Sequence, residues 1–162
     1  MSSSPSLQII YQLKTTKHNR GRSKDGRALS SVEKYSFFRE DKQWDVLGET
    51  SHTKVARWGH AAVAMPRKNA IFAIGGRNSD MQDLSSVEVA KQSPAGDLQW
   101  NRLPYGMRQK RFGAAAVPIG PAAFMAMGGY NGSRWTNTAV LYEVDGDDIR
   151  DGVWTDLPDM HK

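Results

Sequence analysis

The chain of 162 residues contains no cysteine. It therefore has no disulfide framework, no thiolate nucleophile and no cysteine ligands for a zinc finger. Long hydrophobic runs are missing as well, because no apolar segment approaches the ~20 residues that a membrane helix requires. The first six residues lack the charged and apolar parts of a signal peptide. These absences predict a cytoplasmic protein with no membrane partner, and they leave a nuclear location open.

Catalytic patterns are scarce. The four histidines, at positions 18, 52, 60 and 161, do not have the spacing of metal ligands. Four aspartates gather between residues 145 and 151, but Gly146 stands in the wrong place for a calcium loop. The sequence shows neither a glycine-rich phosphate loop that opens a helix nor a Ser-His-Asp pattern. We therefore expect no metal, no cofactor and no enzymatic activity.

The net charge of +5 is spread unevenly, with the acidic residues concentrated near the end of the chain. Residues 14–27 hold six cations and one acid. Such a cluster can bind nucleic acid by releasing counterions. However, no aromatic residue stands among these cations to stack on a base. We interpret the segment as a solvated loop and keep nucleic-acid binding as an alternative.

The most informative segment of the sequence occurs twice. Residues 57–63 (RWGHAAV) lead to an apolar run that ends in a double glycine at 70–76, and then to VEV at 87–89 and WNRLP at 100–104. The same landmarks recur in the same order 53 or 54 positions later. The later set comprises residues 111–117, 122–129, 140–142 and 154–158. Self-similarity at this period indicates a repeat fold.

A partial copy precedes both complete ones. The five residues LSSVE at 29–33 recur at 84–88, and Trp44 takes the place of Trp100. The apolar segment 7–13 is not followed by a double glycine, so this first unit departs from the pattern.

This ordered set of landmarks resembles the kelch repeat, and the resemblance covers roughly residues 29–158. Resemblance to that family implies a β-propeller built of four-stranded antiparallel blades. Trp100 and Trp154 occupy the same repeat position, where a large ring can fill the space between blades. Kelch proteins mostly hold proteins or peptides, through loops at one end of the propeller.

We divide the chain into a disordered tail at 1–6, an incomplete first blade at 7–48 with a basic loop at 14–27, a second repeat at 57–104 and a third at 111–158. The apolar and alternating runs predict strands in all three units. These strands fall near residues 7–13, 32–38, 43–47, 59–64, 70–74, 86–91, 98–102, 113–117, 123–127, 139–144 and 153–157. The expected fold is all-β, a partial kelch-type β-propeller of about two and a half to three blades.

A closed propeller needs about four to eight blades. The open blade faces of a shorter array would expose apolar side chains to water. We therefore expect the chain either to belong to a longer propeller or to self-associate.

The family resemblance places ligand contacts in the loops after the double glycines and in those that enter the next inner strand. Carried onto this chain, these contacts are Arg57, Arg77, Asn78, Arg108, Arg111, Tyr130, Asn131 and Arg134. A guanidinium group can grip a carboxylate through two hydrogen bonds, so the expected partner is a protein or an acidic peptide. For Arg57 and Arg111 the alternative is an ion pair with acids of a neighbouring blade.

The sequence thus predicts a non-enzymatic protein-interaction module. One alternative is an enzyme of the isomerase or lyase type on a kelch scaffold, which would need acid and base residues converging on the loop face. The other is nucleic-acid binding through residues 14–27.

Overall fold

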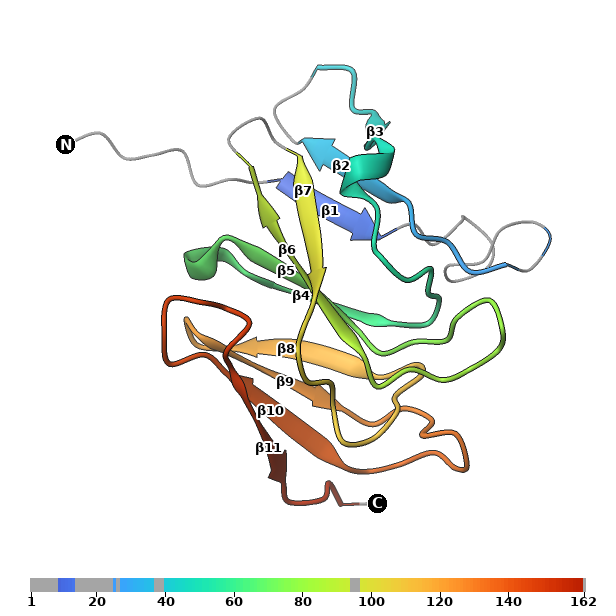
Figure 1. Cartoon of the computed structure of the whole chain (residues 1–162), viewed down its shortest axis with the longest axis vertical. Coiled ribbons are helices and arrows are strands. Elements are labelled where there is room, and N and C mark those ends of the chain that lie inside the picture. The colour runs from blue at the N-terminus through green and yellow to red at the C-terminus, as the bar shows by residue number, and fades with distance from the viewer. Residues whose placement is uncertain (1–8, 14–24, 26, 37–39, 94–96, 162) are drawn as a thin grey trace.

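The computed structural model describes residues 9–13, 25, 27–36, 40–93 and 97–161 (Figure 1). Strands in three antiparallel sheets dominate it, and two short 3-10 turns are the helical elements of this part of the chain. The expected all-β, partial propeller-like fold is therefore confirmed. The expected tail at 1–6 and most of the basic loop at 14–27 lie outside the described residues.

The first sheet has three strands in the order β1-β2-β3. They are β1 (Ile9–Leu13), β2 (Val32–Ser36) and β3 (Trp44–Val46). These elements match the three strands expected for the incomplete first blade. Compared with the other two sheets, this sheet lacks the strand that would pair with the free edge of β1 within the described residues.

The second sheet follows the complete repeat pattern, in the order β4-β5-β6-β7. Its strands are β4 (Ala61–Met65), β5 (Ala70–Ile74), β6 (Val87–Gln92) and β7 (Leu98–Arg102). Alternate residues of β4 are buried and exposed, as expected for a strand with one covered face. The polar turn between β4 and β5 is the 3-10 turn η2 (Pro66–Lys68), which ends at Asn69 in the left-handed region (φ 48°).

The third sheet repeats this order as β8-β9-β10-β11. Its strands are β8 (Ala115–Ile119), β9 (Ala123–Met127), β10 (Ala139–Glu143) and β11 (Val153–Leu157). β8 continues through Pro118 to Ile119, beyond the predicted end of this strand at residue 117. A proline fits here because β8 is an edge strand with one neighbour, β9, so no strand on its other side requires a hydrogen bond from the missing N–H.

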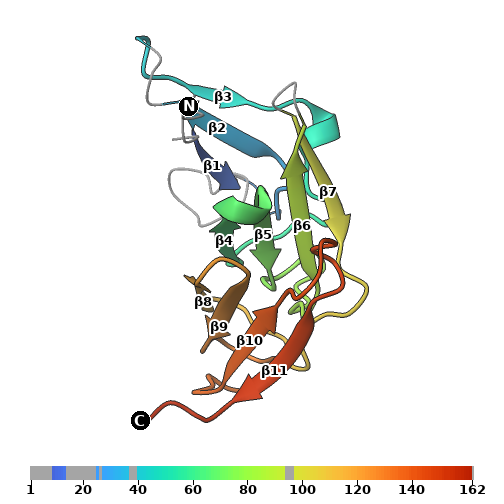
Figure 2. The same ribbon diagram turned by 90° about the vertical axis from the view of Figure 1, so that its left-hand side faces the viewer.

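The three sheets follow one another along the long axis of the molecule (Figure 2). The largest core lies between the second and third sheets, where the tilted rings of Phe72 and Phe124 contact each other with centroids 4.7 Å apart. A smaller core joins the first sheet to the second through Val32 and Trp100. The second sheet is therefore covered on both faces.

The two repeats share the same strand register, although the sequence comparison had placed their third landmark one position off. The N–H of Gly75 donates to the carbonyl oxygen of Ser86, and the N–H of Gly128 donates in the same way to that of Thr138. Ser86 thus corresponds to Thr138, and Glu88 corresponds to Val140. The sequence comparison had aligned Val140 with Val87, one position off, because the loop after the double glycine is one residue shorter in the third repeat.

The two repeated tryptophans both pack against aromatic or apolar neighbours, as expected. Trp100 is buried between the first and second sheets, and its Nε1 has no hydrogen-bond partner among the described residues. Trp154 is half-buried against Tyr142, with ring centroids 4.7 Å apart, and its Nε1 donates to the carbonyl oxygen of Tyr105.

Trp100→Ala is expected to cost ~3–5 kcal/mol of unfolding free energy, because it leaves a cavity between two sheets. Trp100→Phe should cost much less, since it retains a ring and the indole N–H makes no hydrogen bond to lose. Urea unfolding followed by circular dichroism measures both. Equal midpoints for wild type and Trp100→Ala would show that this ring does not hold the two sheets together.

Candidate functional site

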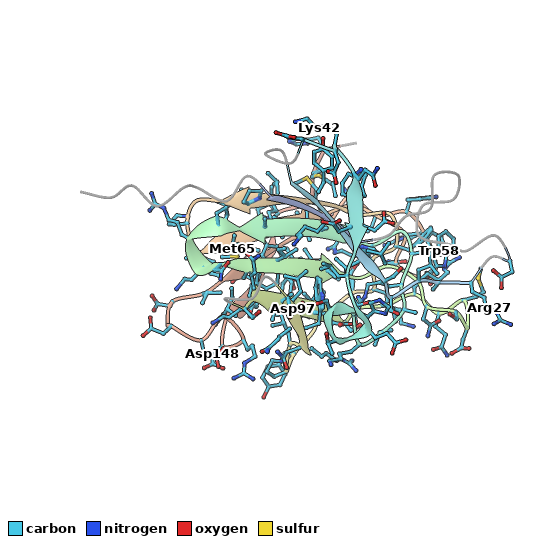
Figure 3. All side chains as sticks on the ribbon, turned by 90° about the horizontal axis from the view of Figure 1, so that it is seen from above. Arg27, Lys42, Trp58, Met65, Asp97 and Asp148 are labelled. Atoms are coloured by element: carbon cyan, nitrogen blue, oxygen red, sulfur yellow. The ribbon has the colours of Figure 1, made fainter. Side chains whose placement is uncertain are left out.

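The segments that carry the predicted ligand residues lie at one end of the strands, called here the loop end. Trp58 lies at this end, and Met65 and Asp148 lie toward the opposite one (Figure 3). The double glycine brings two loops together here, because the N–H of Gly76 (φ 93°) donates to the carbonyl oxygen of Arg111 at 2.7 Å. A Cβ on Gly76 would lie 2.8 Å from the carbonyl oxygen of Trp58, so a side chain would push the loops apart.

Arg77 lies at the centre of the loop end, against two aromatic rings. Its guanidinium carbon is 4.6 Å from the centroid of Phe112 and 5.8 Å from that of Trp58. Its Nε donates to Oδ1 of Asp83 at 2.6 Å. This hydrogen bond raises the pKa of Arg77 above its ordinary value. Arg77 is therefore charged, and its charge is already paired with an acid of the same loop.

The next loop continues this aromatic surface. The ring of Tyr130 meets that of Trp135 at a centroid distance of 5.8 Å, and 70% of Trp135 is exposed. Asn131 shapes the turn, since its Oδ1 accepts the N–H groups of Ser133 and Arg134. The guanidinium of Arg134 is exposed and makes no hydrogen bond or ion pair with any described residue.

We call Trp58, Arg77, Phe112, Tyr130, Arg134 and Trp135 the loop-end cluster. Asn78, also predicted as a ligand residue, instead closes its own turn with Gln82 through a side-chain and a backbone hydrogen bond. The sequence prediction missed Trp58 and Phe112, although both follow the repeated arginine. Trp135 has no counterpart in the other repeat, so periodicity gave no signal for it.

Arg57 does not face a ligand at the loop end, which corrects the prediction. Its side chain is 1% exposed and its Nη2 lies 2.6 Å from Oε1 of Glu88 in the same blade. Burial lowers the pKa of Arg57, and Glu88 opposes that effect. The ion pair that we had considered as the alternative is therefore present, with an acid of its own blade and not of a neighbouring one.

Arg111 is likewise buried, with no exposed surface, so the prediction is corrected here too. It donates to the carbonyl oxygens of Gly128 and Thr138, and to Oγ1 of Thr138 at 2.8 Å. Unlike Arg57, it contacts no carboxylate among the described residues, and its Nε has no partner there. Burial lowers the pKa of Arg111.

Arg108 lies in the linker before the third repeat and is not part of the loop-end cluster. Its guanidinium is exposed and lies 2.7 Å from Oδ2 of Asp156. Exposed pairs of this kind typically add ~0–1 kcal/mol to stability. Arg108 is nevertheless placed at a pocket of about 570 Å³ that opens between the linker before the third repeat and strands β10 and β11.

His60 directly precedes β4. Its Nδ1 is buried and has no hydrogen-bond partner among the described residues. Burial, together with the nearby charge of Arg57, lowers the pKa of His60 to about 4. The imidazole is therefore neutral at pH 7.

The described residues contain no group of three or more His, Cys, Asp or Glu side chains that could hold a metal ion. None of their helices is both long and apolar enough to cross a membrane.

Comparison with known proteins gives a relationship of fold. No protein-family model matches the chain, and no curated protein matches it. A solved structure described as "Structure of YjhT" is similar, with a TM-score of 0.68 and 16% sequence identity. The match covers 88% of this chain and 47% of that one, so this chain spans about half the length of the similar structure.

Proposed function

We propose that this chain is a non-enzymatic interaction module of the kelch-repeat type, which binds an acidic segment of a protein at the loop-end cluster. The observation that carries the proposal is the exposed guanidinium of Arg134 beside the exposed ring of Trp135. Aromatic residues and arginine are enriched at the centres of protein interfaces. An arginine that has no acid of its own chain can offer its full fork to a carboxylate.

The surrounding residues prepare this surface for an extended acidic ligand. Arg77 is fixed in place by its ion pair with Asp83 and by two aromatic rings. It therefore forms a fixed part of the surface under the ligand, and its charge is already paired. Lys110 is exposed, and its Cδ lies about 3.9 Å from where a Cβ would stand on Gly132, in the same loop as Arg134. Lys110 and Arg134 are thus two cations without a partner among the described residues, which favours a ligand with more than one carboxylate.

Arg134→Ala is expected to weaken binding of an acidic peptide about tenfold, the effect of losing a charge-assisted hydrogen bond. Fluorescence anisotropy with a labelled peptide of alternating Glu and Tyr measures it, and a peptide of alternating Lys and Tyr serves as the ligand control. Trp135→Ala should also weaken binding, while circular dichroism should remain unchanged for both variants.

Arg67→Ala is the matched control, because Arg67 is an exposed arginine of η2, at the opposite end of the strands. If Arg67→Ala and Arg134→Ala lower the peptide affinity equally, the binding depends on the net charge of the chain and not on the loop-end cluster. Identical affinities for wild type and Arg134→Ala would remove the loop-end cluster from the proposal.

A further inference from the structure

In the second sheet, the carboxylate of Glu88 occupies a fully buried site built by the linker that enters the blade. The backbone N–H groups of Lys54 and Val55 donate to its two oxygens, at 2.6 Å and 2.9 Å. Nη2 of Arg57 supplies the third hydrogen bond, at 2.6 Å. Two adjacent N–H groups and one guanidinium thus form a receptor for a carboxylate.

The third sheet has the same linker geometry. Residues 107–111 follow the path of residues 53–57, because the first and last residue of each segment donate an N–H group to equivalent carbonyl oxygens of the preceding blade. These hydrogen bonds are Thr53 to Ser30 and Arg57 to Leu29 in one repeat, and Met107 to Ser85 and Arg111 to Leu84 in the other. Arg108 and Gln109 therefore stand where Lys54 and Val55 stand.

The carboxylate itself is missing from this second receptor. Val140 takes the place of Glu88, and the residue paired with it across the sheet is Asp156, whose carboxylate is bound to the side chain of Arg108. Within the described residues, the backbone N–H groups of Arg108 and Gln109 make no hydrogen bond.

Two further polar groups of the same segment are also left without partners in the described part of the chain. They are the buried Nε of Arg111 and the buried Oε1 of Gln109. Native proteins rarely leave buried polar groups unpaired, so several such groups around one site call for an explanation. An acceptor oxygen of a bound ligand would pair with the Nε–H of Arg111, whereas Oε1 of Gln109 is itself an acceptor and needs a donor.

This incomplete receptor adjoins the pocket of about 570 Å³. Val140, Arg108 and Asp156 line the pocket, and so do the two aromatic residues Trp154 and Tyr105. A ligand in the pocket would therefore lie beside Val140, the residue that takes the place of Glu88. The same ligand would place an apolar body against the two rings.

We infer that this pocket binds the carboxylate of a ligand that also carries a flat apolar group, either a peptide ending in an aromatic residue with a free carboxyl terminus or a small aromatic acid. The carboxylate accepts the N–H groups of Arg108 and Gln109 and meets the positive field of the buried Arg111. The aromatic group packs on Trp154. This inference does not rest on the loop-end cluster, although Phe112 of that cluster belongs to the same linker.

Benzoate is the probe that tests it, with benzamide as its neutral counterpart. In nuclear magnetic resonance titrations, benzoate should shift the amide signals of Arg108 and Gln109 downfield, and benzamide should bind at least about tenfold more weakly. An acetylated tripeptide ending in phenylalanine is compared with its carboxyl-terminal amide. If the tripeptide with the free carboxyl terminus binds more tightly than benzoate, the site is assigned to peptides. If benzoate binds more tightly than this tripeptide, the site is assigned to small acids.

Val140→Glu is the decisive variant, because it restores inside the chain the carboxylate that the second sheet has. It should abolish the benzoate-induced shifts and place the two amide signals downfield without ligand. Undiminished benzoate binding by folded Val140→Glu would overturn the inference. If that variant does not fold, the wild-type titration still decides, since equal effects of benzoate and benzamide, or none at the two amides, overturn it as well.

Discussion

Glu88→Ala is expected to lower the free energy of unfolding by ~3–5 kcal/mol, the effect of removing one partner of a buried ion pair. Glu88 has no exposed surface, and its carboxylate is the acceptor for Arg57 and for two backbone N–H groups. The variant would leave a buried guanidinium without its counter-charge and two amides without an acceptor. Urea unfolding of the isolated chain measures the change.

Glu143→Ala is the matched control, because Glu143 lies at the exposed end of β10. Its effect should stay within about 0.5 kcal/mol, as for most surface substitutions. Glu88→Ala must therefore move the unfolding midpoint well beyond Glu143→Ala. Equal midpoints for the two variants would mean that the buried pair contributes nothing to stability.

The third sheet shows how a blade tolerates the loss of this acid. Arg111 turns its Nη2 to Oγ1 of Thr138, at 2.8 Å, and Val140 fills part of the space with methyl groups. The second sheet has Ser86 and Glu88 at these two positions. We expect the double variant Ser86→Thr, Glu88→Val to be more stable than Glu88→Ala. The introduced threonine can accept a hydrogen bond from the buried arginine, as Thr138 does, and the introduced valine fills part of the space, as Val140 does.

The strands could be predicted from the sequence because each element repeats. The apolar run before the double glycine and the tryptophan before Leu-Pro mark β5 and β7 in one unit and β9 and β11 in the next. Local patterning decides which face of a strand is apolar, and a repeated pattern fixes the order of strands. The first blade was harder, since its double glycine is absent, yet the partial match located β2 and β3 and the apolar residues at 7–13 located β1.

The candidate site was less predictable, because it depends on contacts between residues that are distant in sequence. Arg57 and Glu88 are separated by 31 positions, and nothing beside Arg57 in the sequence shows that it is buried against that acid. The correspondence between Glu88 and Val140 was hidden by the shorter loop before β10. A shift of one residue along a strand moves each side chain to the other face of the sheet. The sequence alignment therefore did not show that the third sheet lacks a carboxylate at the Glu88 position, and the backbone hydrogen bonds did.

The isolated chain is expected to self-associate through the two outermost blade faces, which complement each other. The second sheet is covered by Tyr142 and Trp154 of the third. The first sheet carries an equivalent pair on its outer face, Tyr35 and Trp44, with ring centroids 5.1 Å apart and Trp44 43% exposed. No other described sheet lies on that face.

The opposite end of the array has the surface that such a pair would cover. Val63 and Phe72 of the second sheet are buried against the third, and their counterparts in the third sheet are Val117 and Met125. Val117 is 38% exposed, because no further sheet of the described chain covers it. The aromatic pair of one copy can therefore pack on the outer face of the third sheet of another.

Such an interface joins the outer face of the first sheet in one copy to the outer face of the third sheet in the other. Two copies that make this contact at both ends form a closed ring. Two copies of three sheets give six, which falls within the range of about four to eight blades at which propellers close. We therefore expect light scattering to report a mass that rises from monomer to dimer with concentration.

Trp44→Ala and Val117→Glu should each shift this equilibrium to the monomer, since each variant damages one of the two unlike faces. Tyr105→Ala is the control, because Tyr105 is 80% exposed but belongs to the linker and to neither face. A mixture of the two face variants should recover association, because the intact faces of the two proteins can still meet once. A wild-type monomer at every concentration, or a mixture no more associated than its components, would contradict head-to-tail pairing.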